Sequence, residues 1–470
     1  MRESYIQLVY ENSTPLPSFI AFGDMLASKE RENRDFAEGT RMTTAFLQCI
    51  ENGCHRKHAL NLKEYRCEAC GGMLEVRYDA PRVAPETLQR TWQLRKSSSA
   101  IEDQSGVWRF RELLPFVPEG RSVVTLGEGR TPLLDVPRAG EWAGGVRLAI
   151  KHQGNNPTGS FKDLGMTACI TEAAILGSRV TVCASTGNTS ASMSAYAVRA
   201  GMKAVVTVPA GKISAAKLAQ AIEFGAVVIE IGETFDDSFR LLRALTNDMN
   251  LYLVNSLNPF RLEGQKTIVC EILEQRDWRV PEFIVVPGGN LGNISAIGKG
   301  LIELKEMGLI QKMPRLVVAQ AEGANPFYRM IESGGTEMIP VVEPRTEASA
   351  IRIGNPVNWK KALRAIRATD GLAESVSDEE IFAAKAALAH DGVGCEPASA
   401  TTIAGIRKLV AGGKIPRGAD VVAVLTGHQL KDPEISLRRR SEVDMARQLL
   451  RVEPDVKHLR AALERVLASA

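Results

Sequence analysis

From about residue 146 onward, short apolar runs rich in β-branched residues alternate with longer segments of helical periodicity. Buried strands between helices are typical of parallel sheets covered on both faces, so the sequence predicts an α/β fold. The expected strands span residues 146–151, 180–184, 204–208, 227–231, 251–254, 283–286, 316–321 and 421–425. The expected helices span residues 162–176, 189–200, 214–224, 235–249, 262–274, 294–307, 359–368, 377–390 and 397–410.

Basic and acidic side chains nearly balance, with 58 Lys and Arg against 55 Asp and Glu. The net charge of +3 gives no reason to expect nucleic acid or an anionic membrane as a partner. Residues 1–30 lack the basic start and apolar run of a signal peptide, and no apolar run is long enough to span a membrane. We therefore expect a soluble, cytoplasmic protein.

The two ends of the chain carry charged segments. The run 29–35 is expected on a solvated helix or loop, and residues 433–470 form a charged helical tail. Leu459, Leu463 and Leu467 recur at a four-residue step, which predicts that this tail docks against the body or against a second subunit.

Four of the eight cysteines cluster near the N-terminus. Cys67 and Cys70 form a Cys-x-x-Cys-Gly-Gly knuckle typical of a zinc ribbon, whereas Cys49 and Cys54 are spaced more widely than ribbon ligands usually are. Two histidines between the pairs could change the ligand set. Two interpretations stay open, a structural zinc site and a ribbon that keeps its shape without metal.

The segment 155–163 is a turn-rich loop that runs into a helix, and Lys162 lies where the loop becomes the helix. Pro157 and Gly159 favour a tight bend, and Ser160 is placed to cap the helix. The helix dipole and N-terminal amides disfavour an ammonium charge there, so Lys162 should lose its proton easily. A neutral amine can attack an aldehyde, which favours a Schiff-base lysine over an ion-pairing one. From this loop alone, a solvated surface lysine stays open as the alternative.

Three further loops follow predicted strands, where ligands bind in parallel α/β sheets. Residues 185–190 gather hydroxyls and amides that suit a carboxylate or a ring oxygen, although a plain N-cap by Asn188 or Thr189 stays open. Residues 287–293 carry three glycines without a nucleotide-binding signature, so a monophosphate is expected there. The last strand ends at Thr426, a neutral hydroxyl. Together these features provide what pyridoxal 5'-phosphate needs.

These stretches resemble the threonine synthase family of pyridoxal-phosphate enzymes, which has the tryptophan-synthase-β-like fold. The matching stretches are residues 156–163, 184–190, 255–258, 261–266, 287–293, 351–356, 395–399 and 425–428, in the family's order. The resemblance implies the fold-type II class with two parallel-sheet α/β domains. The large domain would comprise residues 91–159 with 258–432, the small domain 160–257, the ribbon-containing extension 1–90 and the helical tail 433–470.

The resemblance also implies a role for each site residue. Lys162 would form the Schiff base with the cofactor, Asn188 would bond its ring oxygen, and Thr426 would face its pyridine nitrogen. The cofactor phosphate would be held by the backbone of Gly289, Asn290, Leu291, Gly292 and Asn293. The substrate carboxylate would be held by Ser185, Thr186, Asn188 and Thr189, and a substrate phosphate by Asn255, Ser256 and Arg261. No metal is expected in this catalytic site.

The implied reaction converts O-phospho-L-homoserine and water to L-threonine and phosphate by γ-elimination and β-addition of water. Lys162 would alternate between acid and base, so its pKa should lie near the working pH. A homodimer is expected from the family alone. Leu164 resembles plant-type members, which S-adenosylmethionine activates, and such activation stays open here.

Three alternatives also stay open. The first is another enzyme of the family, such as a cysteate synthase or a threonine dehydratase, although Arg261 favours a phosphorylated substrate. The second is a catalytically silent homologue, and the third is a nucleotide-binding protein, which would lack its usual glycine–lysine signature. Without the resemblance, Arg261 itself would be interpreted as a surface helix residue.

Overall fold

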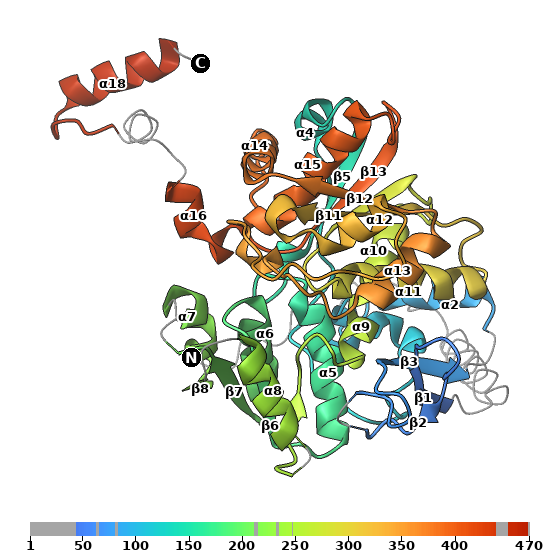
Figure 1. Ribbon diagram of the computed structural model, residues 1–470. Helices are drawn as coiled ribbons and strands as arrows, with labels where there is room; N and C mark the ends of the chain where they lie inside the picture. Colours follow the sequence, from blue (N-terminus) through green and yellow to red (C-terminus); the bar gives the residue numbers. More distant parts are fainter. Residues whose placement is uncertain are drawn as a thin grey trace, which may run out of the picture.

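The computed structural model describes residues 44–62, 65–79, 83–210, 215–231, 235–246, 248–438 and 450–468 (Figure 1). The charged run 29–35 lies outside these residues. Within them the chain forms two mainly parallel sheets with helices around them and a small antiparallel sheet near the N-terminus. The predicted α/β fold is therefore confirmed.

The larger sheet has six strands in the order β12-β11-β10-β13-β5-β4. The strands are β4 Leu133–Asp135, β5 Arg147–His152, β10 Phe283–Pro287, β11 Arg315–Ala321, β12 Leu372–Val376 and β13 Asp420–Leu425. All neighbours pair in parallel except β4 with β5. The sequence predicted neither β4 nor β12. β12 reads Leu-Ala-Glu-Ser-Val and so has no continuous apolar run, but the sheet buries Glu374 and Ser375 within it.

Helices cover this sheet on both faces (Figure 1). They are α4 Pro137–Trp142, α10 Thr267–Glu274, α11 Gly292–Glu306, α12 Pro326–Glu332, α13 Trp359–Ala368, α14 Asp378–Ala389 and α15 Pro397–Ala411. A capping box starts α14. The Ser377 hydroxyl accepts from the Glu380 backbone N–H at 3.2 Å, and the Glu380 carboxylate accepts from the Ser377 backbone N–H at 2.7 Å.

The smaller sheet has four parallel strands in the order β8-β7-β6-β9. They are β6 Val180–Ala184, β7 Lys203–Val208, β8 Val227–Glu230 and β9 Tyr252–Leu253. The helices of this part are α5 Lys162–Ile175, α6 Asn188–Arg199, α7 Ala215–Glu223 and α8 Phe235–Leu245. Every strand predicted between residues 180 and 254 is thus found, with ends within about two residues.

A single helix over 262–274 was predicted, but the structure has two, α9 Phe260–Gln265 and α10. α9 packs closely against α5. A Cβ atom on Gly264 would lie 1.7 Å from the Leu164 carbonyl oxygen, and one on Gly165 would lie 2.8 Å from the Arg261 carbonyl oxygen. These two glycines let the helices approach, which brings the start of α5 close to α9.

The N-terminal ribbon is a three-stranded antiparallel sheet in the order β2-β1-β3. Its strands are β1 Thr44–Cys49, β2 Lys57–His58 and β3 Leu74–Asp79, and β3 contacts α9 (Figure 1). The chain continues through the helices α2 Pro85–Arg95 and α3 Ile101–Gln104 and a short 3-10 helix, Trp108–Leu113. Trp92 and Trp108 are fully buried there, so this segment joins the ribbon to the main core.

The tail contains α16 Pro433–Arg438 and α18 Val456–Ala468. The tail was predicted to dock against the body or against a second subunit, and α18 lies away from the body (Figure 1). Leu459, Leu463 and Leu467 are 51%, 53% and 74% exposed. The helical stripe is therefore present without a covering surface from the described part of this chain.

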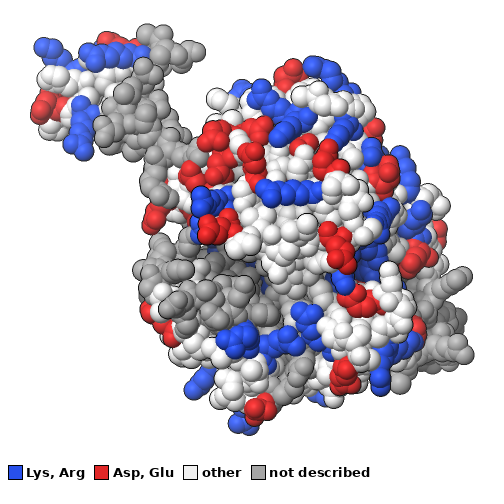
Figure 2. Space-filling model, in the orientation of Figure 1, with Lys and Arg blue, Asp and Glu red and all other residues white. Residues whose placement is uncertain are grey.

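Acidic and basic side chains are interspersed on the face of the molecule shown in Figure 2. Within the ranges given above, none of the helices combines the length and the apolar character that a membrane crossing requires.

Candidate active site

The predicted site residues gather in two adjoining cavities. The larger, of about 650 Å³, is lined by all seven predicted substrate-binding residues and by Lys162. The smaller, of about 50 Å³, is lined by all the predicted cofactor-binding residues. Lys162, Asn188 and Arg261 line both cavities. The tertiary structure thus brings together loops that lie as far apart in the chain as those of Thr158 and Thr426.

Lys162 is the first residue of α5, as predicted, but the helix does not have the predicted cap. The N-cap residue is Phe161, without a side-chain hydrogen bond, and Ser160 only accepts a long 3.4 Å contact from the Lys162 backbone N–H. The prediction that Ser160 caps the helix is therefore wrong. Gly159 has φ of +82°, which supports the predicted tight bend.

The pKa of Lys162 is lowered to about 7, first by burial and then by the positive charge of Arg261, while Glu396 opposes the shift. A lowered pKa of Lys162 agrees with the direction expected from the sequence. The expected cause was the helix N-terminus, whereas burial inside the cavity is the largest cause. A lysine with this pKa has both its neutral and its charged form populated near neutral pH.

Arg261 is buried in α9 with 2% of its surface exposed, so the interpretation as a surface helix residue is wrong. One guanidinium nitrogen donates to the Val254 carbonyl at 3.0 Å, whereas Nε has no hydrogen-bond partner among the described residues. A buried cation with an unused donor at a cavity wall is expected to bind an anion.

The glycine-rich loop leads into the N-terminus of α11. Its N-cap is Leu291, with a φ of +60° and no side chain able to cap the helix. Both polar atoms of the buried Asn293 side chain also lack partners among the described residues. A Cβ atom on Gly289 would lie 3.2 Å from the Ala350 carbonyl oxygen, so the loop is closely held. Uncapped amides at a helix N-terminus suit a phosphate group.

Glu396 was not assigned a role by the sequence, although it lines both cavities. Its carboxylate accepts from the Asn188 side-chain amide and from the Thr426 hydroxyl, each at 3.0 Å. Ser399 lies 3.0 Å from Thr426 and accepts the Thr426 backbone N–H at 2.8 Å. Because the Thr426 proton points to Glu396, the Ser399 hydroxyl donates to Thr426. The sequence offered two signals: Glu396 lies in the family-matching stretch 395–399, and it immediately precedes Pro397 at a helix start.

The hydrogen bond to Glu396 fixes the orientation of the Asn188 side chain. The N-cap of α6 is Gly187, without a side-chain cap, so the alternative of a plain cap by Asn188 or Thr189 is wrong. Asn188 instead turns across the cavity to Glu396, which lies 208 residues away in the chain. Burial raises the pKa of Glu396, and the two donors counteract that shift.

Asp163 fixes the loop that precedes Lys162. Its carboxylate accepts from the backbone and hydroxyl of Thr158 at 2.7 and 2.6 Å and from the Ser192 hydroxyl at 2.6 Å. These bonds tie the loop 155–163 to α6 of the smaller sheet. Asp163 therefore positions Lys162 without lining either cavity.

Comparison with known proteins identifies the family. A family model described as pyridoxal-phosphate dependent enzyme matches residues 124–427. The chain is 44% identical to the threonine synthase of Methanosarcina acetivorans over 420 residues, which cover 89% of this chain and 98% of that protein. The chain belongs to the threonine synthase family. A threonine synthase of Methanocaldococcus jannaschii is also 44% identical, and the match covers 89% of this chain and 99% of that protein. That of Mycobacterium leprae is 46% identical over 70% of this chain and 89% of its own length.

Solved structures share the fold of this threonine synthase family member. A fungal L-serine ammonia-lyase from Rhizomucor miehei gives a TM-score of 0.58 at 22% identity, covering 67% of this chain and 98% of that one. Maize serine racemase gives a TM-score of 0.56 at 18% identity, covering 78% of this chain and 100% of that one. The expected fold-type II class is thereby confirmed.

The residues of the site fit the cofactor of this family, pyridoxal phosphate. Lys162 supplies an amine with a lowered pKa, and the start of α11 supplies uncapped amides beside the unpartnered Asn293 side chain. The smaller cavity connects these two features, because both Lys162 and the loop 289–293 line it. Both anchoring points of the cofactor, amine and phosphate, are therefore available in one place.

Proposed function

We propose that this chain converts O-phospho-L-homoserine and water to L-threonine and phosphate. The observation that carries the proposal is the buried Arg261 with its unpartnered Nε, which lines both cavities together with Lys162. A second anion site beyond the cofactor loop is what a phosphorylated amino acid requires, and an arginine fork matches phosphate oxygens. The family supports the same reaction.

The proposed cofactor contacts follow the cavity walls. Lys162 holds pyridoxal phosphate covalently, the backbone of residues 289–293 holds its phosphate, and Asn188 and Thr426 contact its ring. When bound, the cofactor withdraws electrons from the substrate's amino-acid carbons. Because Thr426 offers a hydroxyl rather than a carboxylate, it does not stabilise a charged pyridine nitrogen.

The proposed substrate contacts divide by charge. Ser185, Thr186, Asn188 and Thr189 hold the carboxylate, and Asn255, Ser256 and Arg261 hold the phosphate. The Asn255 amide and carbonyl bond the backbone of Ala184 at 3.0 and 3.1 Å, so this residue also fixes the loop that carries the carboxylate-binding hydroxyls. The two anionic ends of one substrate would thus be bound by neighbouring strand ends.

Lys162 moves the protons in this proposal. In its neutral form it accepts the Cα proton and gives it to the phosphate group as that group leaves. It also accepts a Cβ proton, and the Cγ–O bond breaks with its electron pair leaving on phosphate. The lysine returns the Cβ proton to Cγ. A water oxygen then bonds to Cβ, the proton that this water loses passes to the lysine, and the lysine delivers it to Cα. A pKa of about 7 lets one amine serve as both base and acid near neutral pH.

The test is release of phosphate and formation of L-threonine from O-phospho-L-homoserine by the purified, pyridoxal-phosphate-loaded protein. We expect equal amounts of both products, and neither from Lys162→Ala. Lys203→Ala, an exposed lysine of β7, is the matched control and should react like the unaltered protein. A protein that carries the cofactor but releases no phosphate would contradict the substrate, and phosphoserine with sulfite or threonine alone would then be tried. Absence of the imine's visible absorbance would favour a silent homologue.

Organisation beyond the site is also proposed. We propose a large domain of residues 91–159 with 258–432 and a small one of 160–257, supported by the fact that each holds all the strands of one sheet.

We propose a homodimer that works in the cytoplasm on a small molecule, without nucleic acid or membrane partners. Sedimentation analysis tests the dimer, and a monomer at working concentration would contradict it.

A further inference from the structure

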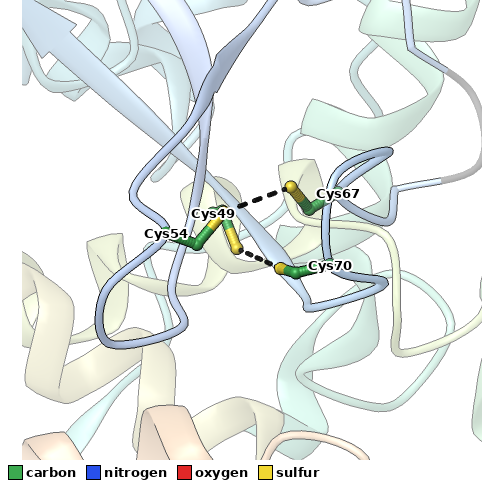
Figure 3. Close-up of side chains that lie close together, drawn as sticks. All are labelled: Cys49, Cys54, Cys67 and Cys70. Atoms are coloured by element: carbon green, nitrogen blue, oxygen red, sulfur yellow. Dashed lines mark hydrogen bonds between the residues drawn. The ribbon is translucent and has the colours of Figure 1, made fainter.

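Four cysteine side chains of the ribbon converge on one point (Figure 3). None of them lines either active-site cavity. The sulfurs of Cys49, Cys54, Cys67 and Cys70 all lie within 4.8 Å of one another. The Cys49–Cys70 sulfurs are 3.5 Å apart and the Cys54–Cys67 sulfurs 3.6 Å. A disulfide needs about 2.05 Å, so neither pair is bonded.

These distances suit a metal ion. Four thiolates around zinc, with Zn–S bonds of about 2.3 Å, stand at tetrahedral corners about 3.8 Å apart. The observed sulfur separations lie close to that value. Thiolates are soft ligands, and a tetrahedral set of four selects zinc or iron. The wide spacing of Cys49 and Cys54 does not prevent the convergence, because β1 pairs with β3 and brings the two cysteine loops together.

The loops leave the space among the sulfurs open. In the second loop the Cys67 backbone N–H donates to the Gly72 carbonyl at 2.8 Å, and Gly71, with φ of +69°, donates to the Cys67 carbonyl at 2.7 Å. A Cβ atom on Gly72 would overlap Glu51 Cγ and would lie 3.1 Å from the Cys49 sulfur and 3.2 Å from the Cys70 sulfur. A larger residue at 72 would therefore displace the Glu51 side chain and press on two of the sulfurs.

A histidine of the ribbon supports one sulfur from outside the set. His58 Nε2 lies 3.3 Å from the Cys67 sulfur, and its Nδ1 lies 3.9 Å from the Glu68 carboxylate. A ring nitrogen bonded to a ligand, with the other nitrogen beside a carboxylate, is the arrangement of a residue that orients a metal ligand. The four thiols are thus the candidate ligands, and His58 contacts one of them from outside the set.

We propose that Cys49, Cys54, Cys67 and Cys70 bind one Zn²⁺ ion, which stabilises the ribbon. Four protein ligands close the coordination sphere and leave no position for a reactant, so the role is structural. The ribbon needs such support because β2 has only two residues and the three-stranded sheet is small. In a closed thiolate site the binding free energy of the metal adds to folding.

The ribbon also supports α9, which carries Arg261. The ring of Tyr65 packs edge-on against Tyr252 and Phe260 at 6.2 and 6.4 Å, and the Tyr78 hydroxyl donates to Glu263 at 2.8 Å. The metal would therefore stabilise the surface on which α9 rests. This second role rests on the proposed function, whereas metal binding itself does not.

The experiment measures metal in the full-length protein by plasma mass spectrometry after purification without chelator. We expect about one zinc per chain, and Co²⁺ exchanged into the site should give the intense thiolate-to-cobalt bands and tetrahedral d–d bands of a four-sulfur site. Cys70→Ser, the most exposed ligand, should lose most of the zinc and lower the melting temperature. Cys270→Ser is the control, since Cys270 is a buried thiol of α10 outside the cluster, and it should keep the zinc.

Four results would overturn the proposal. The first is a wild-type protein that carries less than a tenth of an equivalent of zinc after growth and refolding with added zinc. The second is full zinc content in Cys70→Ser. The third is complete zinc loss in His58→Ala together with cobalt bands of mixed sulfur–nitrogen ligation in the wild type. The fourth is bound iron in place of zinc. Because the cobalt spectrum is recorded on the unaltered protein, the test holds even if a variant fails to fold.

Discussion

Lys162 and Arg261 line the same cavities, where burial and then the Arg261 charge lower the pKa of Lys162 to about 7. The two cations lie on neighbouring helices, α5 and α9, that approach through Gly165 and Gly264. Arg261 can thus both bind a substrate anion and hold Lys162 ready to lose its proton. This double role has a consequence that can be measured.

Arg261→Gln should raise KM for O-phospho-L-homoserine about 10- to 100-fold, because a charge-assisted contact worth about 1.5–3 kcal/mol is lost. It should also raise the pKa of Lys162, so the acidic limb of kcat/KM should move to higher pH, since only the neutral amine acts as the base. Steady-state kinetics across pH measure both effects. Arg329→Gln on the exposed side of α12 is the control, and an unchanged KM would contradict the phosphate assignment.

Glu396→Gln should move the acidic limb of kcat/KM to lower pH. The Glu396 charge raises the pKa of Lys162, so neutralising it lets the amine lose its proton at lower pH. Glutamine also leaves one of the donors Asn188 and Thr426 without its acceptor, at a cost of about 1–3 kcal/mol in local stability. The pH profile of kcat/KM is the measurement, and Glu322→Gln at an exposed position is the control. A shift to higher pH would show that Glu396 does not act through charge.

Gly289→Ala should weaken retention of pyridoxal phosphate at least about tenfold. The added Cβ would lie 3.2 Å from the Ala350 carbonyl oxygen and 3.3 Å from the Ile351 Cα, so the loop must shift away from its phosphate-binding position. Dissociation of the cofactor during dialysis, followed by its visible absorbance, measures the effect. Gly412→Ala, where the nearest atom would be 3.4 Å away, should retain the cofactor normally. Equal retention by both variants would speak against the phosphate role of this loop.

Glu172→Gln should stabilise the protein at alkaline pH. Burial raises the pKa of Glu172 to about 8 from an ordinary 4.5, so between these values the folded state binds a proton that the unfolded state has released. The contribution of Glu172 to the free energy of unfolding therefore falls as pH rises from about 4.5 through about 8. A pKa that differs by one between the folded and unfolded states changes the free energy of unfolding by about 1.4 kcal/mol.

Melting temperatures of Glu172→Gln and of the unaltered protein should therefore agree below about pH 4.5 and diverge in favour of the variant above about pH 8. Glu223→Gln, an exposed residue of α7, should show no such divergence. Destabilisation of the Glu172 variant at alkaline pH would mean that the ionised carboxylate has a stabilising partner.

The sequence by itself determined the elements and loops of this protein. The β-branched runs and helical periodicities located most strands and helices, because each pattern is complete within one element. The turn before Lys162 and the glycines at 287–293 likewise predicted a reactive lysine and a phosphate-binding loop. Each of these sequence patterns is complete within one loop, so both predictions could be made without knowing the rest of the fold.

Only the tertiary structure decided the relationships between distant residues. The meeting of Asn188 with Glu396, the burial of Arg261 and the polar strand β12 depend on packing between elements, which local propensity does not encode. The cause of the lowered pKa of Lys162 is of the same kind, since burial and the charge of Arg261 act through space. The four ribbon sulfurs also converge only because β1 pairs with β3, which no spacing of cysteines along the chain could specify.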